Sequence, residues 1–155
     1  MTARPTILHG TCVARGGMAA LVTGPSGGGK SDLALRFLDR YADAWLVADD
    51  QVVVARSGDR VEASAPAPLR GLLEVRGLGL IRRRYASAPL AVIIELLAPD
   101  GQMPRIAEPD FHEIEGCALP VVPLAGFEAS APLRLAIILD TLARHGFPGD
   151  DGKLG

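Results

Sequence analysis

The chain has 155 residues, a length typical of a single domain that buries a substantial core. Hydrophobic residues make up 48% of it and charged residues 22%, which is an ordinary globular composition. Lys plus Arg number 16 and Asp plus Glu 18, so the net charge is −2, which argues against a broad basic surface for nucleic acid.

The first part of the chain predicts two strands and a helix around a glycine-rich loop. A weakly alternating stretch, 11–17, predicts a strand that enters a Gly-Gly turn. The continuous apolar run at 18–24 is typical of a buried central strand. Apolar residues spaced from Ser31 onward predict a helix with a broad apolar face, which we expect to stop near 41–43.

The middle of the chain is predicted to be mainly β-structure. The apolar stretch 44–50 predicts a second buried strand that two carboxylates close, and 51–64 predicts a hairpin turning at Ser57-Gly58-Asp59. The proline-rich stretch 65–71 predicts a loop. Residues 72–85 mix apolar residues, two glycines and a basic run, and their pattern assigns no element.

The last third predicts one more strand and one helix. Residues 89–99 are β-branched and predict a strand, 99–116 a polar, turn-rich loop, and 117–132 an extended segment limited by proline. Helical periodicity at 133–146 ends at a glycine. We expect one domain over 1–146 and a disordered tail over 147–155. Strands that alternate with helices predict an α/β fold, and the hairpins predict a mixed sheet.

The stretch GPSGGGKS matches the phosphate-binding pattern G-x-x-x-x-G-K-[ST]. Its glycines let backbone N–H groups converge on phosphate oxygens, and the following helix adds its dipole. Lys30 would neutralise the β- and γ-phosphates, and the Ser31 hydroxyl would ligate Mg²⁺. A flexible turn is the alternative, but the strand before and the helix after favour nucleotide binding. The predicted cofactor-binding residues are Gly24, Pro25, Ser26, Gly27, Gly28, Gly29, Lys30 and Ser31.

Two carboxylates, Asp49 and Asp50, end the predicted strand at 44–50. One of them is suited to ligate Mg²⁺ through water and the other to accept a proton from an attacking hydroxyl. A solvated turn is the alternative, since acidic pairs often end strands. The P-loop upstream favours the site.

Three further features have plainer explanations. The basic run at 82–84 would suit an acidic partner surface, but charge runs are usually solvated faces. The cluster Asp110, His112, Glu113, Glu115 and Cys117 has no standard metal spacing, and a polar surface loop is favoured. Cys12 and Cys117 lie far apart, which favours free thiols. With no signal-peptide core and no run long enough to span a bilayer, we expect a cytoplasmic protein without a membrane partner.

Four strings together carry a family resemblance: His-Gly at 9–10, the P-loop, LVADD at 46–50 and LEVRGLGLI at 73–81. Over about residues 7–140 the chain resembles the C-terminal catalytic domain of the HPr kinase/phosphorylase family. The EVRGLG string is the specific element, because ordinary P-loop proteins lack it. The chain looks like the short bacterial forms that lack the N-terminal domain. The resemblance implies an α/β P-loop fold with a mixed central sheet flanked by helices.

The resemblance also implies site residues. His9 matches the family histidine beside the catalytic aspartate, Asp50 matches the base of phosphorylation, and Asp49 is its support. Lys30 matches the phosphate-binding lysine. The remaining matches are Ser31 and Glu74 as metal ligands, and Arg76 within the catalytic segment.

The implied function is an ATP- and Mg²⁺-dependent kinase of a seryl hydroxyl on the phosphocarrier HPr or a paralogue. A homo-oligomer, a hexamer in the family, is implied as well. Alternatives are a catalytically silent nucleotide-binding regulator and a small-molecule P-loop kinase. Longer members carry a PGRN segment where this chain has EASAPLRLAIILD, with Arg134 out of register. We therefore expect the reverse phosphorolysis of phosphoseryl-HPr to be weakened.

Overall fold

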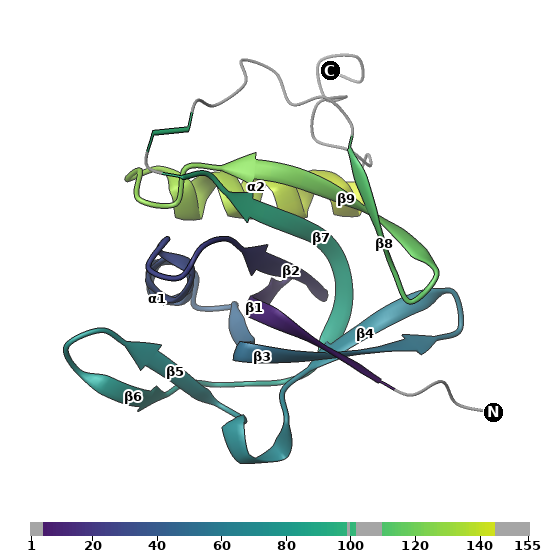
Figure 1. Cartoon of the computed structure of the whole chain (residues 1–155), viewed down its shortest axis with the longest axis horizontal. Helices are drawn as coiled ribbons and strands as arrows, with labels where there is room; N and C mark the ends of the chain where they lie inside the picture. Colours follow the sequence, from purple (N-terminus) through teal and green to yellow (C-terminus); the bar gives the residue numbers. More distant parts are fainter. Residues whose placement is uncertain (1–4, 99, 102–109, 145–155) are drawn as a thin grey trace.

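The computed structural model describes residues 5–98, 100–101 and 110–144. These residues form an α/β fold in which a mixed sheet is flanked by helices (Figure 1). The elements are β1 Thr6–Arg15, β2 Met18–Thr23, α1 Lys30–Arg40, β3 Trp45–Ser57, β4 Arg60–Ser64, β5 Leu72–Val75, β6 Gly79–Arg82, β7 Ala88–Leu96, β8 Phe111–Ile114, β9 Cys117–Leu124 and α2 Ala131–Arg144. A 3-10 turn, Ala67–Leu69, precedes β5. The predicted tail 147–155 lies outside the described residues.

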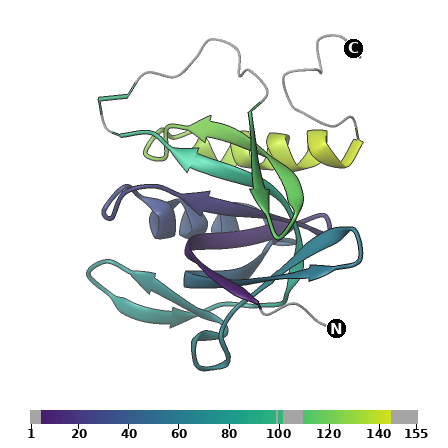
Figure 2. The ribbon, with the colours of Figure 1, turned by 45° about the vertical axis from the view of Figure 1, so that its right-hand side comes forward.

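The main sheet has the strand order β2-β1-β3-β4-β7-β9-β8, and β2 also pairs with β7. This extra pairing closes β2, β1, β3, β4 and β7 into a ring, and the strongly curved β7 makes the closure possible (Figure 2). The β2–β7 and β7–β9 pairs are parallel, and the other pairs of this sheet are antiparallel. The mixed sheet predicted from the sequence is confirmed.

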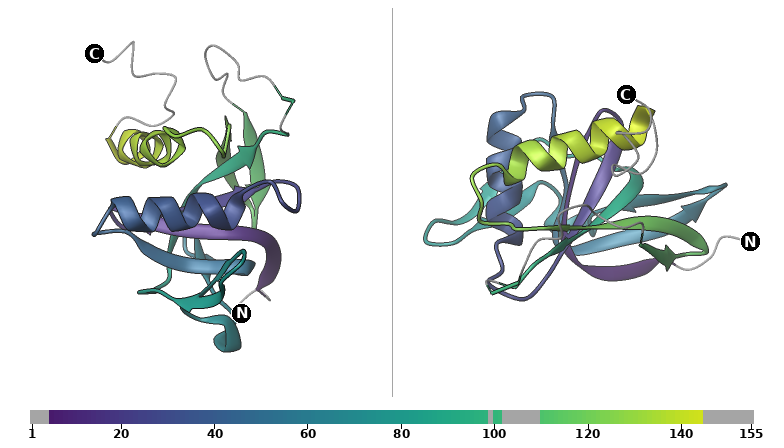
Figure 3. Two further views of the ribbon diagram at one scale, coloured as in Figure 1. Left: turned by 90° about the vertical axis from the view of Figure 1, so that its left-hand side faces the viewer. Right: turned by 90° about the horizontal axis from the view of Figure 1, so that it is seen from above.

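Two apolar cores lie on the two sides of this sheet. Both helices pack on one side, where Phe37 of α1 and Leu135 of α2 are fully buried with the inward residues of β2, β7 and β9 (Figure 3). The second core fills the β-strand side around Cys12, Val54 and Val61. The helices therefore cover one face of β2, and the carboxyl end of this strand leads into the glycine-rich loop.

Most predicted elements in the first half are confirmed, with two changes. The P-loop, α1 and the β3–β4 hairpin turn at 58–59 lie where expected. The first strand begins at Thr6 rather than at 11, so His9 belongs to β1. The strand predicted to end at Asp50 instead continues to Ser57, because β1 pairs with it on both sides of the acidic pair.

The later elements differ more from those predicted from the sequence. The unassigned stretch 72–85 contains the β5–β6 hairpin, a separate two-stranded sheet. Part of the predicted polar loop forms β8, which pairs with β9 around a turn whose Glu115 and Gly116 have positive φ. Helix α2 starts two residues earlier than predicted, because Pro132 fits a first helical turn, where no intrahelical N–H bond is lost.

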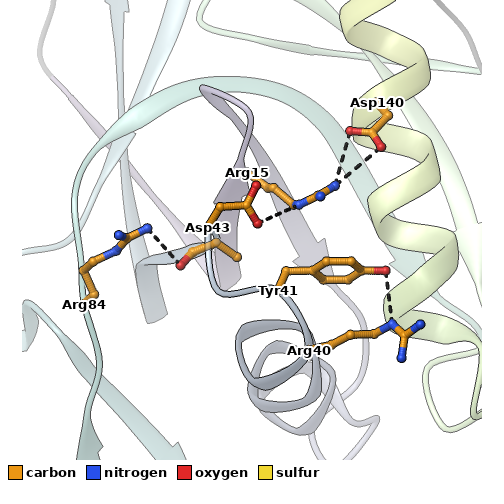
Figure 4. Close-up of polar contacts among 7 residues, drawn as sticks. Arg15, Arg40, Tyr41, Asp43, Arg84 and Asp140 are labelled. Carbon is orange, nitrogen blue, oxygen red and sulfur yellow. Dashed lines mark hydrogen bonds and ion pairs between the residues drawn. The ribbon is translucent and has the colours of Figure 1, made fainter.

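A charged cluster fixes the far end of α1. Arg15, at the end of β1, donates to Asp43 at 3.0 Å and to Asp140 of α2 at 3.4 Å, and its guanidinium lies 4.5 Å from the centre of the Tyr41 ring (Figure 4). Arg84 donates to the Ala44 carbonyl at 3.3 Å. The Arg15 cluster thus ties β1, the residues that follow α1, and α2 together.

Candidate active site

A cleft of about 690 Å³ opens at the carboxyl end of β2, a volume typical of small-ligand sites. It is bounded by β1, the P-loop, α1, β3, the β5–β6 hairpin and the loop between β9 and α2. Its lining residues are His9, Gly10, Thr11, Gly24, Ser26, Gly27, Gly29, Lys30, Ser31, Asp32, Leu35, Asp49, Asp50, Glu74, Val75, Arg76 and Phe127. The structure thus gathers every predicted catalytic and metal residue in one cleft.

The P-loop runs from the end of β2 into the first turn of α1. Gly27 and Gly29 have φ values of 77° and 96°, a backbone region that side chains disfavour, so the loop depends on glycine there. The Lys30 ammonium donates to the Gly24 and Pro25 carbonyls at 3.0 and 3.1 Å. These contacts hold the cation over the loop, beside the N-terminus of α1, where anions bind favourably.

Asp49 is the organising carboxylate of the cleft. It is only 7% exposed and accepts three hydrogen bonds. Thr11 Oγ1 and Ser31 Oγ donate to its Oδ1 at 2.8 and 2.9 Å, and the Glu74 N–H donates to its Oδ2 at 2.9 Å. Asp49 therefore joins β1, α1 and β5, a larger role than the support expected from the sequence.

Asp50 is oriented by an unusual backbone. Neighbouring residues of a strand normally point to opposite faces. Asp50 has a φ of 70°, which interrupts this alternation, and both it and Asp49 line the cleft. Such a conformation of a non-glycine residue costs about 1–3 kcal/mol and occurs often at functional sites.

The Asp50 carboxylate lies at the open mouth of the cleft. His9 Nδ1 is 3.6 Å from Asp50 Oδ1, and the two side chains are 86% and 66% exposed. A protonated His9 therefore forms an ion pair with Asp50. In contrast with the buried Asp49, this pair is accessible to a large molecule.

The register of β1 on β3 explains why these groups meet. Gly10 lies opposite Asp50, and Thr11 opposite Asp49. A Cβ atom on Gly10 would lie 2.7 Å from the carbonyl oxygen of Val22 on β2, so only glycine at this position lets β1 lie this close to β2. The sequence indicates Gly10 only as part of the His-Gly string and does not single out Thr11. The one feature that could have marked Thr11 is that it is a polar residue directly before an apolar stretch.

The β5–β6 hairpin supplies the opposite wall. Glu74 lies on β5 and Arg76 in the turn that follows, and both line the cleft. A Cβ atom placed on Gly27 would lie 3.9 Å from Arg76 Nη2, so this guanidinium reaches the tip of the P-loop. The arrangement puts a second cation beside the place where Lys30 would meet phosphate.

The donor atoms fit a hard cation such as Mg²⁺. The Ser31 hydroxyl lies against the Asp49 carboxylate, and the Glu74 carboxylate lines the same cleft. Mg²⁺ prefers such oxygen ligands and takes one or two from protein, the rest coming from water and phosphate. The described residues contain no cluster of three or more His, Cys, Asp or Glu suited to a metal.

Three sequence candidates lie elsewhere. The arginines at 82–84 do not line the cleft. The polar cluster at 110–117 was predicted to be a loop. It is instead mostly the β8–β9 hairpin, because its residues pair in register. Arg134 lies on α2, 3.5 Å from Glu128, and also does not line the cleft. Conversely, Phe127 lines the cleft, although no sequence pattern singled it out.

Comparisons with known proteins agree on one family. The profile of the HPr serine kinase C-terminal domain matches residues 1–97. Proteins named HPr kinase/phosphorylase from Burkholderia lata and Burkholderia cenocepacia are each 35% identical over an alignment of 148 residues that covers 89% of this chain and 45% of theirs. The chain thus spans about half the length of these curated relatives.

The fold itself also has a solved counterpart. The structure of the Hpr(Ser) kinase/phosphatase from Coxiella burnetii superposes with a TM-score of 0.75 at 22% identity, covering 90% of this chain and 96% of that one. In the part of the chain that the structure describes, neither helix has the length and apolar character needed to cross a membrane. On the match to its profile, the chain belongs to the HPr serine kinase C-terminal domain family.

Proposed function

We propose that the chain is an ATP-dependent protein-serine kinase that phosphorylates the phosphocarrier HPr or a paralogue. The relatives that it resembles are named HPr kinase/phosphorylase. One observation carries the proposal: the exposed His9–Asp50 pair shares a cleft with the P-loop residues Lys30 and Ser31. A base at an open mouth suits a hydroxyl presented by another protein.

In the proposed reaction, the seryl hydroxyl oxygen attacks the γ-phosphorus of ATP and the bond to the β-phosphate oxygen breaks, releasing ADP. Asp50 accepts the hydroxyl proton, and His9 orients its carboxylate. Lys30 and Arg76 balance the charge on the phosphates. Mg²⁺, held by Ser31 with Asp49 and Glu74, would supply further charge neutralisation when bound.

Two alternatives make different predictions. A small-molecule kinase encloses its acceptor, whereas His9 is 86% exposed here. A silent regulator needs no base, yet Asp50 keeps a strained conformation of the kind that occurs often at functional sites. Both observations favour a protein kinase. The homo-oligomer implied by the family stays a prediction.

The direct test incubates the chain with radiolabelled ATP, Mg²⁺ and purified HPr, followed by detection of acid-stable phosphoserine. HPr with its acceptor serine changed to alanine is the matched control. We expect label on HPr and none on the control. Normal ATP binding without transfer to any HPr paralogue would favour the regulator instead.

We further propose that the reverse reaction is much slower than the forward one. Inorganic phosphate attacking phosphoserine brings anions together. Where longer members have the PGRN segment with its arginine, this chain has EASAPLRLAIILD. Arg134, the nearest substitute in sequence, lies by Glu128 rather than in the cleft. Pyrophosphate release from phosphoseryl-HPr, phosphate and Mg²⁺ is the measurement. A rate equal to that of the forward reaction would contradict this asymmetry.

A further inference from the structure

Phe127 is an exposed aromatic residue in the cleft that the proposed chemistry leaves without a role. It lies in the loop between β9 and α2 and is 63% exposed. It belongs to neither apolar core. Its ring instead rests on the P-loop, because a Cβ atom on Gly29 would lie 2.9 Å from the ring atoms Cε1 and Cζ.

The loop that carries Phe127 is held firmly on both sides of the ring. The Arg36 guanidinium of α1 donates to the carbonyl of Gly126 and, at 3.1 Å, to that of Glu128. Gly126 packs so closely that a Cβ atom there would lie 3.0 Å from Leu96 Cδ1. The ring is therefore presented by a fixed backbone, which lowers the entropic cost of binding against it.

The sheet topology places this ring opposite the carboxylates. β2, which leads into the P-loop, pairs with β1 on one side and with β7 on the other. Beyond β1 lies β3 with Asp49, and beyond β7 lies β9, whose following loop carries Phe127. A nucleotide with its phosphates on the P-loop and its terminal phosphate toward Asp49 would place its nucleoside on the side of the cleft that carries Phe127.

We infer that Phe127 is the surface on which the base of the nucleotide stacks, and so a determinant of affinity for the phosphoryl donor. This inference rests on the proposed function of the same cleft. Stacking on an aromatic face requires no hydrogen-bond pattern, since every base has a π-face. The ring therefore selects a nucleoside triphosphate over a bare phosphate chain.

The test measures the affinities of ATP and of inorganic tripolyphosphate in the presence of Mg²⁺. Three variants are compared with the wild type: Phe127→Ala, Phe127→Leu and, as a control, Ile137→Ala, an exposed apolar residue of α2 outside the cleft. We expect Phe127→Ala to weaken ATP binding on the order of ten-fold, as loss of a base–aromatic stack does. Affinity for tripolyphosphate stays unchanged, Phe127→Leu is intermediate, and Ile137→Ala behaves as wild type.

Each other outcome is decisive. If Phe127→Ala binds ATP as tightly as the wild type, the inference is wrong while the proposed function stands. Equal weakening of ATP and tripolyphosphate shows that the ring only shapes the P-loop, which also overturns the inference. A wild-type protein that binds neither ligand contradicts the proposed function itself. Thermal melting of each variant establishes that it is folded.

Discussion

The two ends of helix α1 use charged residues in opposite ways. Beyond its C-terminal end, Arg15 contacts both Asp43 and Asp140, so a cation meets two anions. At its N-terminal end, Lys30 is held by loop carbonyls rather than by a carboxylate, and Asp50 is exposed on a strained backbone. The first end is organised for stability, and the second carries the residues of the proposed reaction.

This contrast extends to the two neighbouring aspartates. Asp49 is buried and accepts three hydrogen bonds, so it contributes to folding as well as to the site. Asp50 has one ionic neighbour, His9, at 3.6 Å among the described residues. Adjacent positions in one strand thus carry a buried, hydrogen-bonded carboxylate and an exposed one.

Replacement of Lys30 should have the largest effect at the chemical end. Lys30→Ala removes the cation of the P-loop, and we expect phosphoryl transfer to fall by at least about 10²–10³-fold, as when a group that stabilises transition-state charge is lost. Arg83→Ala, an exposed cation outside the cleft, is the control and should leave the rate unchanged. A near-normal rate in Lys30→Ala would mean that the cleft is not the site.

The two aspartates should differ in stability when each is replaced. Asp49→Ala leaves buried donors unpaired, and we expect it to lower the free energy of unfolding by about 1–3 kcal/mol. Asp50→Gly relieves the positive φ and should keep or raise stability while abolishing transfer. Urea unfolding and kinase assays of both variants make the comparison. Equal losses of stability would show that Asp50 is not strained.

The Arg15 cluster should affect stability alone. We expect Arg15→Ala to lower the Tm by a few degrees and to leave the kinase rate unchanged. The hydrogen bond from Arg15 holds the pKa of Asp43 below its ordinary value. The contribution is therefore present at neutral pH and is lost as the pH falls through the lowered pKa.

The measurement is the difference in Tm between wild type and Arg15→Ala, followed from pH 7 downward as the pH falls through the lowered pKa of Asp43. The difference should shrink at the lower pH. A difference that persists unchanged would show that packing of Arg15 on Tyr41, rather than charge, holds this end together.

The smallest expected effect concerns the reactivity of the two cysteine thiols, which lie at neither end of α1. Burial raises the pKa of the Cys12 thiol far above its ordinary value, whereas Cys117 is half-buried. In the folded protein we expect a thiol reagent to modify Cys117 and to reach Cys12 only after unfolding, as mass spectrometry of the labelled peptides would show. Rapid labelling of Cys12 would indicate that the second core opens readily.

The chemical end was the more predictable from the sequence. The P-loop is a local pattern, so its spacing and its flanking strand and helix sufficed. Which aspartate meets Ser31 depends on the φ of Asp50 and on the register of β1, and neither is visible in a string of residues. Glu74 was predicted as a metal ligand with Ser31, and its side chain lines the same cleft. The sequence does not predict that its backbone N–H also bonds to Asp49.

Non-local features escaped prediction for the same reason. In the β5–β6 hairpin, β6 contains Gly79 and the exposed Leu80. These residues hide the alternation of polar and apolar side chains by which a strand is usually recognised. The β2–β7 pairing joins strands far apart in the chain. Phe127 reaches Gly29 only because the β9–α2 loop folds over the P-loop, and the sequence around it shows no aromatic pattern.

The most direct test of the whole account uses Asp50→Asn, which keeps the shape of the side chain and tolerates the same backbone. ATP binding and phosphoryl transfer to HPr are measured on one preparation, next to wild type. We predict unchanged affinity for ATP with Mg²⁺ and unchanged Tm, with transfer reduced about 10²–10⁴-fold, the range that a positioned base supplies. Transfer at the wild-type rate would contradict the claim that Asp50 is the base and that this end of α1 performs the chemistry.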